Sequence, residues 1–312
     1  METTKTLGKP QSNSDVLNSQ PRTLLIGYGW VGQFVHKYFT EADFYTPNSG
    51  LCYKDCNKIP DAIVADRRWD VAFIGTPSPM NDDGSCDVSY VKSAVKQWAS
   101  YVKLFIIRST VTPGTTDRLQ KEYPENLFVM SPEYVGETLA HPLTEPNRET
   151  FIILGGIKEA TQLAAYYWSK VLHSNSTIRQ LTALEAEFCK YMENCFLATK
   201  VIFVNDWLRL CDAAGVDFLA LREAWLDDPR IGRSHTFAYR ENPGFSGKCL
   251  PKDLNSIAHW ARYEAKRPLE LVEALLLINA NMRKNIKGTV PLIPKTGALG
   301  DFARQLDDEV EE

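Results

Sequence analysis

The chain has 312 residues, of which 44% are hydrophobic and 24% are charged, and its formal net charge is -4. This length and composition are typical of a globular protein with room for two domains, and they exclude collagen-like, disordered and membrane-spanning classes. The basic residues are dispersed and leave no positively charged footprint, so nucleic acid is not expected as a partner.

The N-terminal segment and the cysteines bear on the expected location. No run of about 18 apolar residues is present, and the first residues lack the apolar segment of a signal peptide. The seven cysteines are odd in number and show no second pair at metal-ligand spacing. We therefore expect a cytoplasmic, reduced protein with no membrane contact and no metal site.

The first half of the chain alternates apolar segments with helix-length segments. Residues 1–20 are polar and are predicted to form a mobile arm. The predicted strands are 23–27, 42–46, 69–75, 102–109, 126–131 and 150–156, and predicted helices lie at about 30–40 and 87–101. Nearly continuous apolar strands separated by helices predict a doubly wound parallel sheet, so we expect a Rossmann-like α/β dinucleotide-binding domain at 21–178.

The second half is predicted to be all-helical. Residues 182–215 contain no proline, and their glycine stands only at the end, so they predict one helix of about 45 to 50 Å at 1.5 Å per residue. Further helices are predicted at 217–226, 251–266 and 268–286. We predict a helical catalytic and dimerisation domain at 179–290 and an acidic C-terminal tail at 291–312.

The first predicted strand runs into GYGWVG, which has the G-x-G-x-x-G spacing of dinucleotide-binding loops. The first glycine permits the turn, the second lets the backbone approach a pyrophosphate at the helix N-terminus, and the third lets the helix pack on the strand. A glycine-rich turn without a ligand is the alternative, but the position between a strand and a helix favours a cofactor. The predicted cofactor contacts in this loop are Gly27, Tyr28, Gly29, Trp30, Val31 and Gly32.

The end of the second predicted strand lacks the carboxylate that usually binds the cofactor ribose. Positions 45–49 are Tyr, Thr, Pro, Asn and Ser, and Asp43 lies too early in the strand. Tyr45, Thr46 or Asn48 has the polar groups to hydrogen-bond a ribose. No arginine marks a 2′-phosphate site, which favours NAD over NADP.

Later segments bring further polar residues to the side where doubly wound sheets bind ligands. These segments are GTPSP (75–79), RSTVTPGTT (108–116), SPEYVGE (131–137), the helical AEFCKYMEN (186–194) and the turn GFSGKCLPKD (244–253). Together with the glycine loop they resemble the UDP-glucose/GDP-mannose dehydrogenase family. Its motifs are a Thr-Pro turn, S-T-V-x-P-G-T, N-P-E-F-x-x-E, A-E-x-x-K-x-x-x-N and G-F-G-G-x-C-x-x-K-D, and the resemblance covers residues 22 to 286 in family order.

The chain departs from this family pattern at several places. Ser131 stands where the family has Asn, Ser246 replaces one glycine of a pair, and the segment between Arg230 and Cys249 is slightly longer. Family members continue into a third domain that holds much of the nucleotide part of the substrate. We therefore expect a shortened member of the family without that domain.

The turn around Cys249 has the residues that a cysteine nucleophile needs. Oxidising a primary alcohol to an acid removes two hydrides in turn, and a cysteine that holds the aldehyde covalently prevents its release. The thiolate would form a thiohemiacetal, hydride loss would give a thioester, and water would hydrolyse it. Lys248 and Lys252 would favour the thiolate, and Asp253 would take or position a proton. Considered alone, Cys249 would be better explained as an ordinary thiol, and it is the glycine-rich turn followed by Lys252 and Asp253 that favours a nucleophile.

Two further pairs of residues complete the predicted chemistry. Lys190 and Asn194 lie four residues apart on one helical face, where both are able to donate to an oxyanion, although alone they would fit a solvated face. The resemblance implies that Glu133 is the base for the hydrolytic water, which Thr110 would help to hold. Without the motifs, Glu133 and Glu137 would fit a surface pair equally well.

The resemblance also assigns contacts to cofactor, substrate and partner subunit. The further cofactor contacts are Thr76, Pro77, Thr110, Glu137 and Lys252, and the substrate contacts are Glu133, Glu137, Lys190, Asn194, Arg230, Phe245 and Gly247. Arg230 matches an arginine that reaches the neighbouring subunit's substrate in relatives, and an ordinary surface arginine is the alternative. The long helix suggests a homodimer, as in the family.

The leading functional prediction is an NAD-dependent enzyme that oxidises the C6 alcohol of a nucleotide-sugar, such as UDP-glucose, to the uronate in two hydride transfers. One alternative is a single-step hydroxyacid or 6-phosphogluconate-type dehydrogenase, which shares the K-x-x-x-N helix and needs no cysteine. Another is a cofactor-binding relative with reduced catalysis and a regulatory or binding role, because the third domain and the ribose carboxylate are missing.

Overall fold

The computed structural model describes residues 21–52, 68–134, 151–284, 286, 294–297 and 300. The predicted N-terminal arm, Glu137 and most of the predicted C-terminal tail lie outside these described residues. Within them, no helix has both the length and the hydropathy that crossing a membrane requires.

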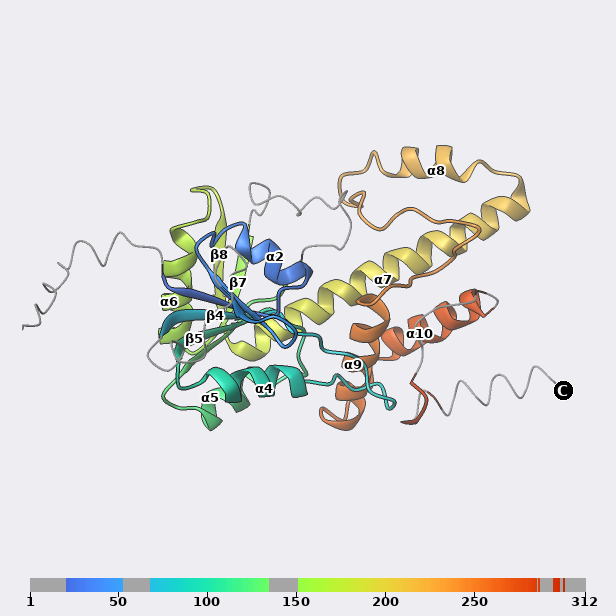
Figure 1. Cartoon of the computed structure of the whole chain (residues 1–312). Coiled ribbons are helices and arrows are strands. Elements are labelled where there is room, and N and C mark those ends of the chain that lie inside the picture. Colours follow the sequence, from blue (N-terminus) through green and yellow to red (C-terminus); the bar gives the residue numbers. More distant parts are fainter. Residues whose placement is uncertain are drawn as a thin grey trace, which may run out of the picture.

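An eight-stranded sheet forms the first half of the protein (Figure 1). Its strands are β1 (Thr23–Ile26), β2 (Asp43–Thr46), β3 (Gly50–Cys52), β4 (Trp69–Ile74), β5 (Val102–Ile107), β6 (Leu127–Met130), β7 (Phe151–Gly156) and β8 (Thr177–Leu181). They lie in the order β3-β2-β1-β4-β5-β6-β7-β8, and the pairs are parallel except β2 with β3 and β6 with β7. The predicted Rossmann-like fold class is confirmed.

Helices cover both faces of the sheet, which explains why its central strands are largely apolar. On one face α4 (Ser89–Trp98) and α5 (Thr115–Glu122) enclose a core cluster that includes Leu24. On the other face α2 (Trp30–His36) and α6 (Lys158–Ser169) enclose a cluster that includes Leu25. Both leucines are 0% exposed, and burying a side chain of this size contributes about 1.5–3 kcal/mol.

The strand order creates a crevice at the carboxyl ends of the central strands. β1 has β2 on one side and β4 on the other, so the chain leaves β1 and β4 in opposite directions. Doubly wound sheets bind ligands at such a switch point. The loops that follow β1, β4, β5 and β6 therefore surround one candidate site.

A single long helix, α7 (Ala183–Ala214), leads from the sheet into the helical second half (Figure 1). Thr182 and Glu185 form a capping box at its start, and Gly215 ends it with a φ of +70°. The following helices are α8 (Phe218–Trp225), α9 (Leu250–Tyr263) and α10 (Glu270–Arg283). Buried Tyr191 of α7 packs with apolar residues of α9 and α10 in one core cluster, so the predicted helical region is confirmed.

Four elements were not predicted from the sequence: β3, β8, α5 and α6. β8 is an edge strand of sequence TIRQL, and its side chains are exposed or half-buried, so it has no apolar alternation to detect. It also extends past residue 178, where we placed a domain boundary. The domain boundaries themselves stay a prediction.

Candidate active site

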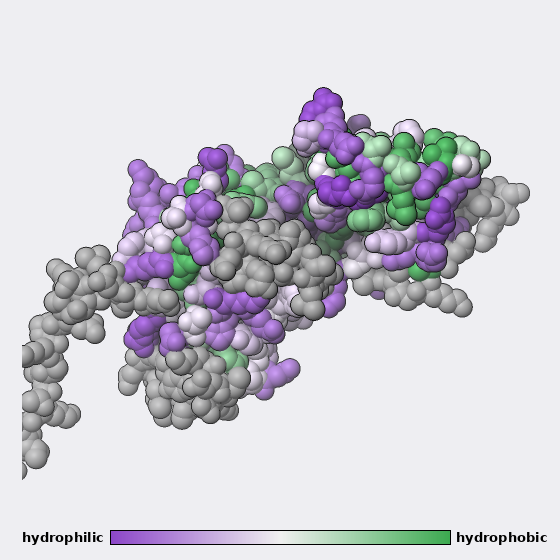
Figure 2. Space-filling model, turned by 90° about the horizontal axis from the view of Figure 1, so that it is seen from above, coloured by the Kyte–Doolittle hydropathy of each residue, from purple (hydrophilic) through white to green (hydrophobic). Residues whose placement is uncertain are grey.

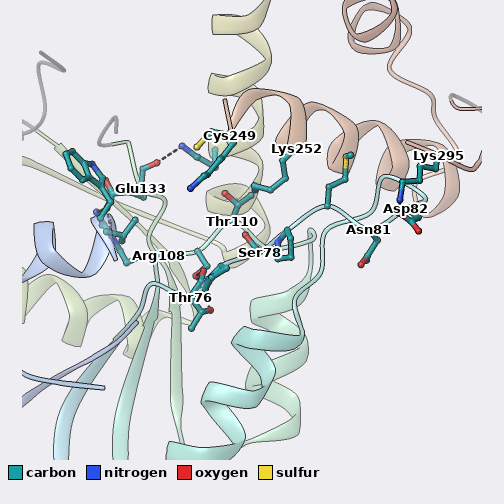
Figure 3. A pocket seen from close by; sticks show the side chains of 18 residues that line it. Thr76, Ser78, Asn81, Asp82, Arg108, Thr110, Glu133, Cys249, Lys252 and Lys295 are labelled. Atoms are coloured by element: carbon teal, nitrogen blue, oxygen red, sulfur yellow. Dashed lines mark hydrogen bonds and ion pairs between the residues drawn. The ribbon is translucent and has the colours of Figure 1, made fainter. Parts of the chain in front are cut away.

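A cavity of about 600 Å³ lies along the carboxyl ends of the strands and beneath the start of α9 (Figure 3). In this view Arg108 and Glu133 lie at one end, Asp82 and Lys295 at the other, and Cys249 and Lys252 between them. The predicted site residues that line it are Trp30, Val31, Thr76, Pro77, Thr110, Glu133, Lys190, Cys249 and Lys252. Segments far apart in the sequence thus meet in one cavity.

The glycine loop has the backbone geometry that a dinucleotide requires. Gly27 has a φ of +91°, and a Cβ there would lie 2.6 Å from Gly75 O. A Cβ on Gly32 would lie 2.2 Å from Gly27 O, so the third glycine is required for the approach of helix to strand. A Cβ on Gly29 would meet nothing within 4 Å, which leaves the backbone there open to a pyrophosphate. These residues fit a bound dinucleotide.

Tyr28 of this loop does not line the cavity. Its ring stacks on Phe44 with 4.2 Å between centroids, and its hydroxyl hydrogen-bonds His36 Nδ1. Trp30 and Val31, which follow, do line the cavity. The side chain of Tyr28 is held against Phe44 of β2. A cofactor contact by Tyr28 stays a prediction.

Glu133 is held by a buried arginine that the sequence analysis did not assign. Arg108 Nε donates to Glu133 Oε2 at 3.1 Å, Nη2 donates to the same oxygen, and Nη1 donates to Ser131 Oγ at 3.0 Å. The second carboxylate oxygen accepts from Tyr134 N at 2.8 Å. The signal in the sequence was a charged residue directly after the apolar β5, because a charge in such a place needs a partner.

Two residues of α7 reach the site from one side of the helix. Lys190 Nζ donates to the backbone oxygen of Glu133 at 2.5 Å and lies 5.3 Å from the centre of the Tyr134 ring. Burial raises the pKa of the Tyr134 phenol, which keeps this ring neutral. One turn further, buried Asn194 donates through Nδ2 to Asp253 Oδ2 at 2.6 Å. Asn194 therefore contacts the turn that carries Cys249, whereas Lys190 contacts Glu133.

Asp253 follows the cavity-lining Lys252, is 1% exposed and pairs with two residues. Its second oxygen, Oδ1, accepts from Lys252 Nζ, and Asn194 binds the other. Burial alone would lower the pKa of Lys252, but attraction to Asp253 and to the nearby thiols raises it above the ordinary value. Lys252 therefore remains an ammonium group at neutral pH.

Cys249 stands at the N-cap of α9 and is exposed to the cavity. The structure describes five cysteine thiols, and the other four, Cys86, Cys189, Cys195 and Cys211, are buried or half-buried. Burial raises the pKa of Cys86 and of Cys189, and it raises that of Cys195 to about 12. Among these thiols Cys249 is therefore the accessible one.

The turn before Cys249 is held by α10. Gly244 has a φ of +73°, and Asn279 Oδ1 lies 2.3 Å from where its Cβ would be. The Asn279 side chain accepts from Phe245 N at 2.7 Å and donates to Phe245 O at 3.0 Å. The Phe245 side chain is buried in the helical core and does not line the cavity, whereas a Cβ on Gly247 would meet nothing within 4 Å.

Other predicted site residues lie elsewhere. The side chain of Arg230 is 85% exposed and pairs with Asp228 of its own loop. Lys200 Nζ holds this loop by donating to the backbone oxygens of Ile231 and Gly232 at 3.2 and 2.8 Å. Glu137 lies outside the described residues. In the described part of the chain, no cluster of three or more His, Cys, Asp or Glu residues is arranged to hold a metal ion.

Comparison with known protein families gives two matches. Residues 59–171 match the NAD binding domain of the UDP-glucose/GDP-mannose dehydrogenase family, and residues 184–281 match its central domain. The first match confirms the predicted cofactor, NAD.

Curated proteins and solved structures agree with these matches. The chain is 31% identical over 74% of its length to UDP-glucose 6-dehydrogenase TuaD of Bacillus subtilis and 28% identical over 66% to a UDP-glucose 6-dehydrogenase of Pseudomonas aeruginosa. It spans about half the length of these relatives, 50% and 48%. A UDP-glucose dehydrogenase structure from Pyrobaculum islandicum shares the fold with a TM-score of 0.71 at 24% identity, over 89% of this chain and 71% of that one.

Proposed function

Because the chain belongs to the UDP-glucose/GDP-mannose dehydrogenase family, we propose that it oxidises the C6 alcohol of a nucleotide-sugar to a carboxylate in two stages. The observation that carries this proposal is the exposed Cys249, which shares one cavity with Thr110, Glu133 and Lys190. A single-step alcohol dehydrogenase needs no cysteine. A thiol in this position is required when an aldehyde must be held for a second oxidation.

The glycine loop and the loops after β4 and β5 are the proposed cofactor site. NAD⁺ bound there supplies the hydride acceptor for each of the two oxidations. Gly29 leaves the backbone open to a pyrophosphate, and Trp30, Val31, Thr76 and Pro77 line the adjoining part of the cavity.

In the first stage the alcohol loses a hydride from C6 and a proton from its oxygen. The Asp253 carboxylate, which Lys252 and Asn194 hold, is the proposed acceptor for this proton through water. The product of this stage is an aldehyde.

In the second stage the Cys249 sulfur adds to the aldehyde carbon, and the carbonyl oxygen becomes an oxyanion. The Lys252 ammonium and the start of α9 favour a negatively charged sulfur, and Lys190 stabilises the oxyanion. Hydride loss from C6 then leaves a thioester. Glu133 takes a proton from water, whose oxygen attacks the thioester, and the C–S bond breaks to release the carboxylate product and the thiol.

The cavity also has the charge that a nucleotide-sugar diphosphate requires. Lys248, Lys252 and Lys295 all line it, and in Figure 3 Lys252 lies in the middle of the cavity and Lys295 at the end away from Glu133. Phosphate oxygens are bound by lysine as a point charge in many protein sites. This arrangement supports an anionic substrate over a small neutral alcohol.

Substitution of the nucleophile tests the two-stage reaction. Cys249→Ser is expected to abolish turnover of UDP-glucose and related nucleotide-sugars, because serine forms no stable adduct at neutral pH. The wild-type protein is expected to produce two NADH for each uronate, measured by absorbance together with product quantification. Cys189→Ser, on α7, is the matched control and should retain full activity. One NADH per product, or normal turnover in Cys249→Ser, contradicts the proposal.

We further propose that two copies of the chain pair through α7. Five large apolar side chains on this helix are exposed by between 44% and 77%; they are Met192, Phe196, Phe203, Trp207 and Leu210, called here the outer stripe. Figure 2 shows hydrophobic residues gathered at the end of the molecule remote from the sheet. An exposed apolar stripe of this length is typical of a protein interface. Pairing would also allow the exposed Arg230 to approach a neighbouring site.

A cytoplasmic location is proposed from the thiols. The five described cysteines are reduced, and one of them is the proposed nucleophile, which a reducing compartment preserves. Fractionation of cells that express the tagged chain tests this, and recovery of the protein outside the cytoplasmic fraction contradicts it.

A further inference from the structure

Arg108 and Glu133 form a buried ion pair in the wall of the cavity (Figure 3). Their side chains are 1% and 8% exposed. A buried ion pair is often no more stable than well-packed apolar side chains of similar volume, so stability alone does not explain a pair at this place. The proposed function uses Glu133 as the base for thioester hydrolysis and leaves Arg108 without a role.

The sheet fixes the backbone beside this pair. Arg108 directly follows β5, and its N–H donates to Ile74 O of β4 at 2.9 Å. Ser131 directly follows β6, and its N–H donates to Ile107 O of β5 at 2.9 Å. The guanidinium carbon lies 5.7 Å from the centre of the Trp168 ring, which is 0% exposed. Arg108 is therefore held at both its backbone and its guanidinium and has little freedom to move.

The guanidinium binds two side chains through three of its nitrogens. Nη1 donates to Ser131 Oγ at 3.0 Å, Nε donates to Glu133 Oε2 at 3.1 Å, and Nη2 donates to the same carboxylate oxygen. The other carboxylate oxygen, Oε1, accepts from Tyr134 N at 2.8 Å. Because the guanidinium is planar, these contacts fix the direction of the carboxylate. A separate contact holds the backbone, since Lys190 Nζ donates to Glu133 O at 2.5 Å.

We propose that Arg108 is a positioning residue that directs the Glu133 carboxylate at the hydrolytic water and selects Oε1 as the atom that accepts the proton. The inference rests on the proposed function, which makes Glu133 this base. A proton on Oε2 would meet two N–H donors of Arg108, whereas a proton on Oε1 leaves both of these charge-assisted hydrogen bonds in place.

The step balances in the following way. The water oxygen bonds to the thioester carbon, and one water proton passes to Glu133 Oε1. The C–S bond then breaks, and the Cys249 sulfur leaves as a thiolate. The carboxylic acid that is formed loses its own proton at neutral pH.

Hydrolysis of p-nitrophenyl acetate tests this step without a nucleotide-sugar or NAD⁺. The Cys249 sulfur attacks the ester carbonyl and p-nitrophenolate leaves, so a burst of absorbance reports the acetyl thioester and the steady-state rate reports its hydrolysis. Arg108→Lys keeps the charge but loses the planar fork. It is expected to keep the burst and to slow the steady-state rate about 10- to 100-fold, because a displacement of about 1 Å can cost about 10²-fold. Arg118→Lys, at an exposed position on α5, is the matched control and should behave as the wild type does.

A double variant shows whether Arg108 acts through Glu133. Adding Arg108→Lys to Glu133→Gln should slow hydrolysis no further, whereas a merely structural role would slow it by the same factor in both backgrounds. Ser131→Ala removes the partner of Nη1 and keeps the ion pair. It should slow the same step by a smaller factor, which provides a second variant if Arg108→Lys fails to fold.

Three results would overturn the inference. They are an unchanged steady-state rate in folded Arg108→Lys, or in Ser131→Ala where Arg108→Lys does not fold; equal slowing by Arg108→Lys with and without Glu133→Gln; and absence of an acetyl adduct on Cys249 from the mass spectra of every variant. A protein that hydrolyses the ester as expected but produces no NADH from UDP-glucose would overturn the proposed function and leave the inference standing.

Discussion

The Lys252–Asp253 ion pair is expected to affect both the stability of the fold and the proposed reaction. Asp253 is 1% exposed, so its negative charge is stabilised by Lys252 and Asn194 and not by water. Removing one member of a buried pair leaves the other charge without compensation, which is costly. The pair is therefore expected to be a structural requirement as well as a feature of the site.

Lys252→Met is expected to lower the free energy of unfolding by about 3–5 kcal/mol, measured by urea denaturation near neutral pH. The folded-state pKa of Lys252 is raised, so its contribution is fully present below about pH 10.4, the ordinary lysine pKa, and is lost as the pH rises through the folded-state value. The free energies of unfolding of the wild type and the variant should therefore become equal only in strongly alkaline solution. Lys248→Met, at an exposed position, is the control, and convergence already near pH 7 contradicts this account.

Glu133 gives a second expectation at the residue scale. Glu133→Gln keeps the shape of the side chain but removes the proposed base for thioester hydrolysis, so steady-state turnover should fall about 10²- to 10⁴-fold. Both oxidations precede hydrolysis, so a burst of two NADH per site should remain, and intact-protein mass spectrometry should detect a sugar adduct on Cys249. The exposed Glu193→Gln on α7 is the control. Loss of the burst together with turnover would assign Glu133 a different role.

At the scale of elements, α10 holds the turn that presents Cys249. Asn279 is 0% exposed and binds both the N–H and the carbonyl of Phe245, so the turn depends on one side chain from a helix that does not line the cavity. The turn precedes the start of α9, and its position sets that of the cysteine.

Asn279→Leu is expected to leave both backbone groups unpaired, at a cost of about 1–3 kcal/mol for each buried group. The alkylation rate of Cys249 by iodoacetamide should change in this variant, and kcat should fall more than the NAD⁺ affinity, because the glycine loop is unaffected. Asn281→Ala, on the exposed side of the same helix, is the control. An unchanged alkylation rate in a folded Asn279→Leu protein would show that the turn is held by other contacts.

The elements that the sequence predicted are those whose burial produces a pattern. Strands such as β1 and β5 are largely apolar because both faces are covered, and α7 is uninterrupted by proline or glycine. β8 gave no such signal, since it is a polar edge strand. Its place depends on pairing with β7, which is a long-range contact that no local pattern reports.

The residues of the candidate site that belong to sequence motifs could be predicted from the sequence. Cys249, Lys190 and Glu133 were expected together from the order of their segments, and they do line one cavity. Arg108 was missed because its role depends on a partner 25 residues away, and the side-chain direction of Phe245 is set by packing against α10. Such contacts depend on the tertiary structure and cannot be read from spacing.

At the scale of the whole molecule, the outer stripe predicts the assembly state. Phe196→Glu combined with Leu210→Glu is expected to convert a dimer to a monomer, because it places charges in an apolar interface, and light scattering after size-exclusion chromatography measures this. Leu184→Glu, near the start of α7 and outside the stripe, is the control. A wild-type protein that is monomeric at micromolar concentration contradicts the proposed pairing.

The length of α7 has a mechanical consequence. Glu187, near its start, accepts hydrogen bonds from Gly114 N and Thr116 N and so anchors the helix to the start of α5. Lys190 and Asn194 follow within two turns, and the outer stripe begins at Met192, between them in sequence, and continues along the same helix to Leu210. No proline or glycine interrupts α7, so the two donor side chains and the outer stripe belong to one continuous helix. If two copies pair through α7, the positions of Lys190 and Asn194 at each cavity would depend on how the two helices pack in the dimer.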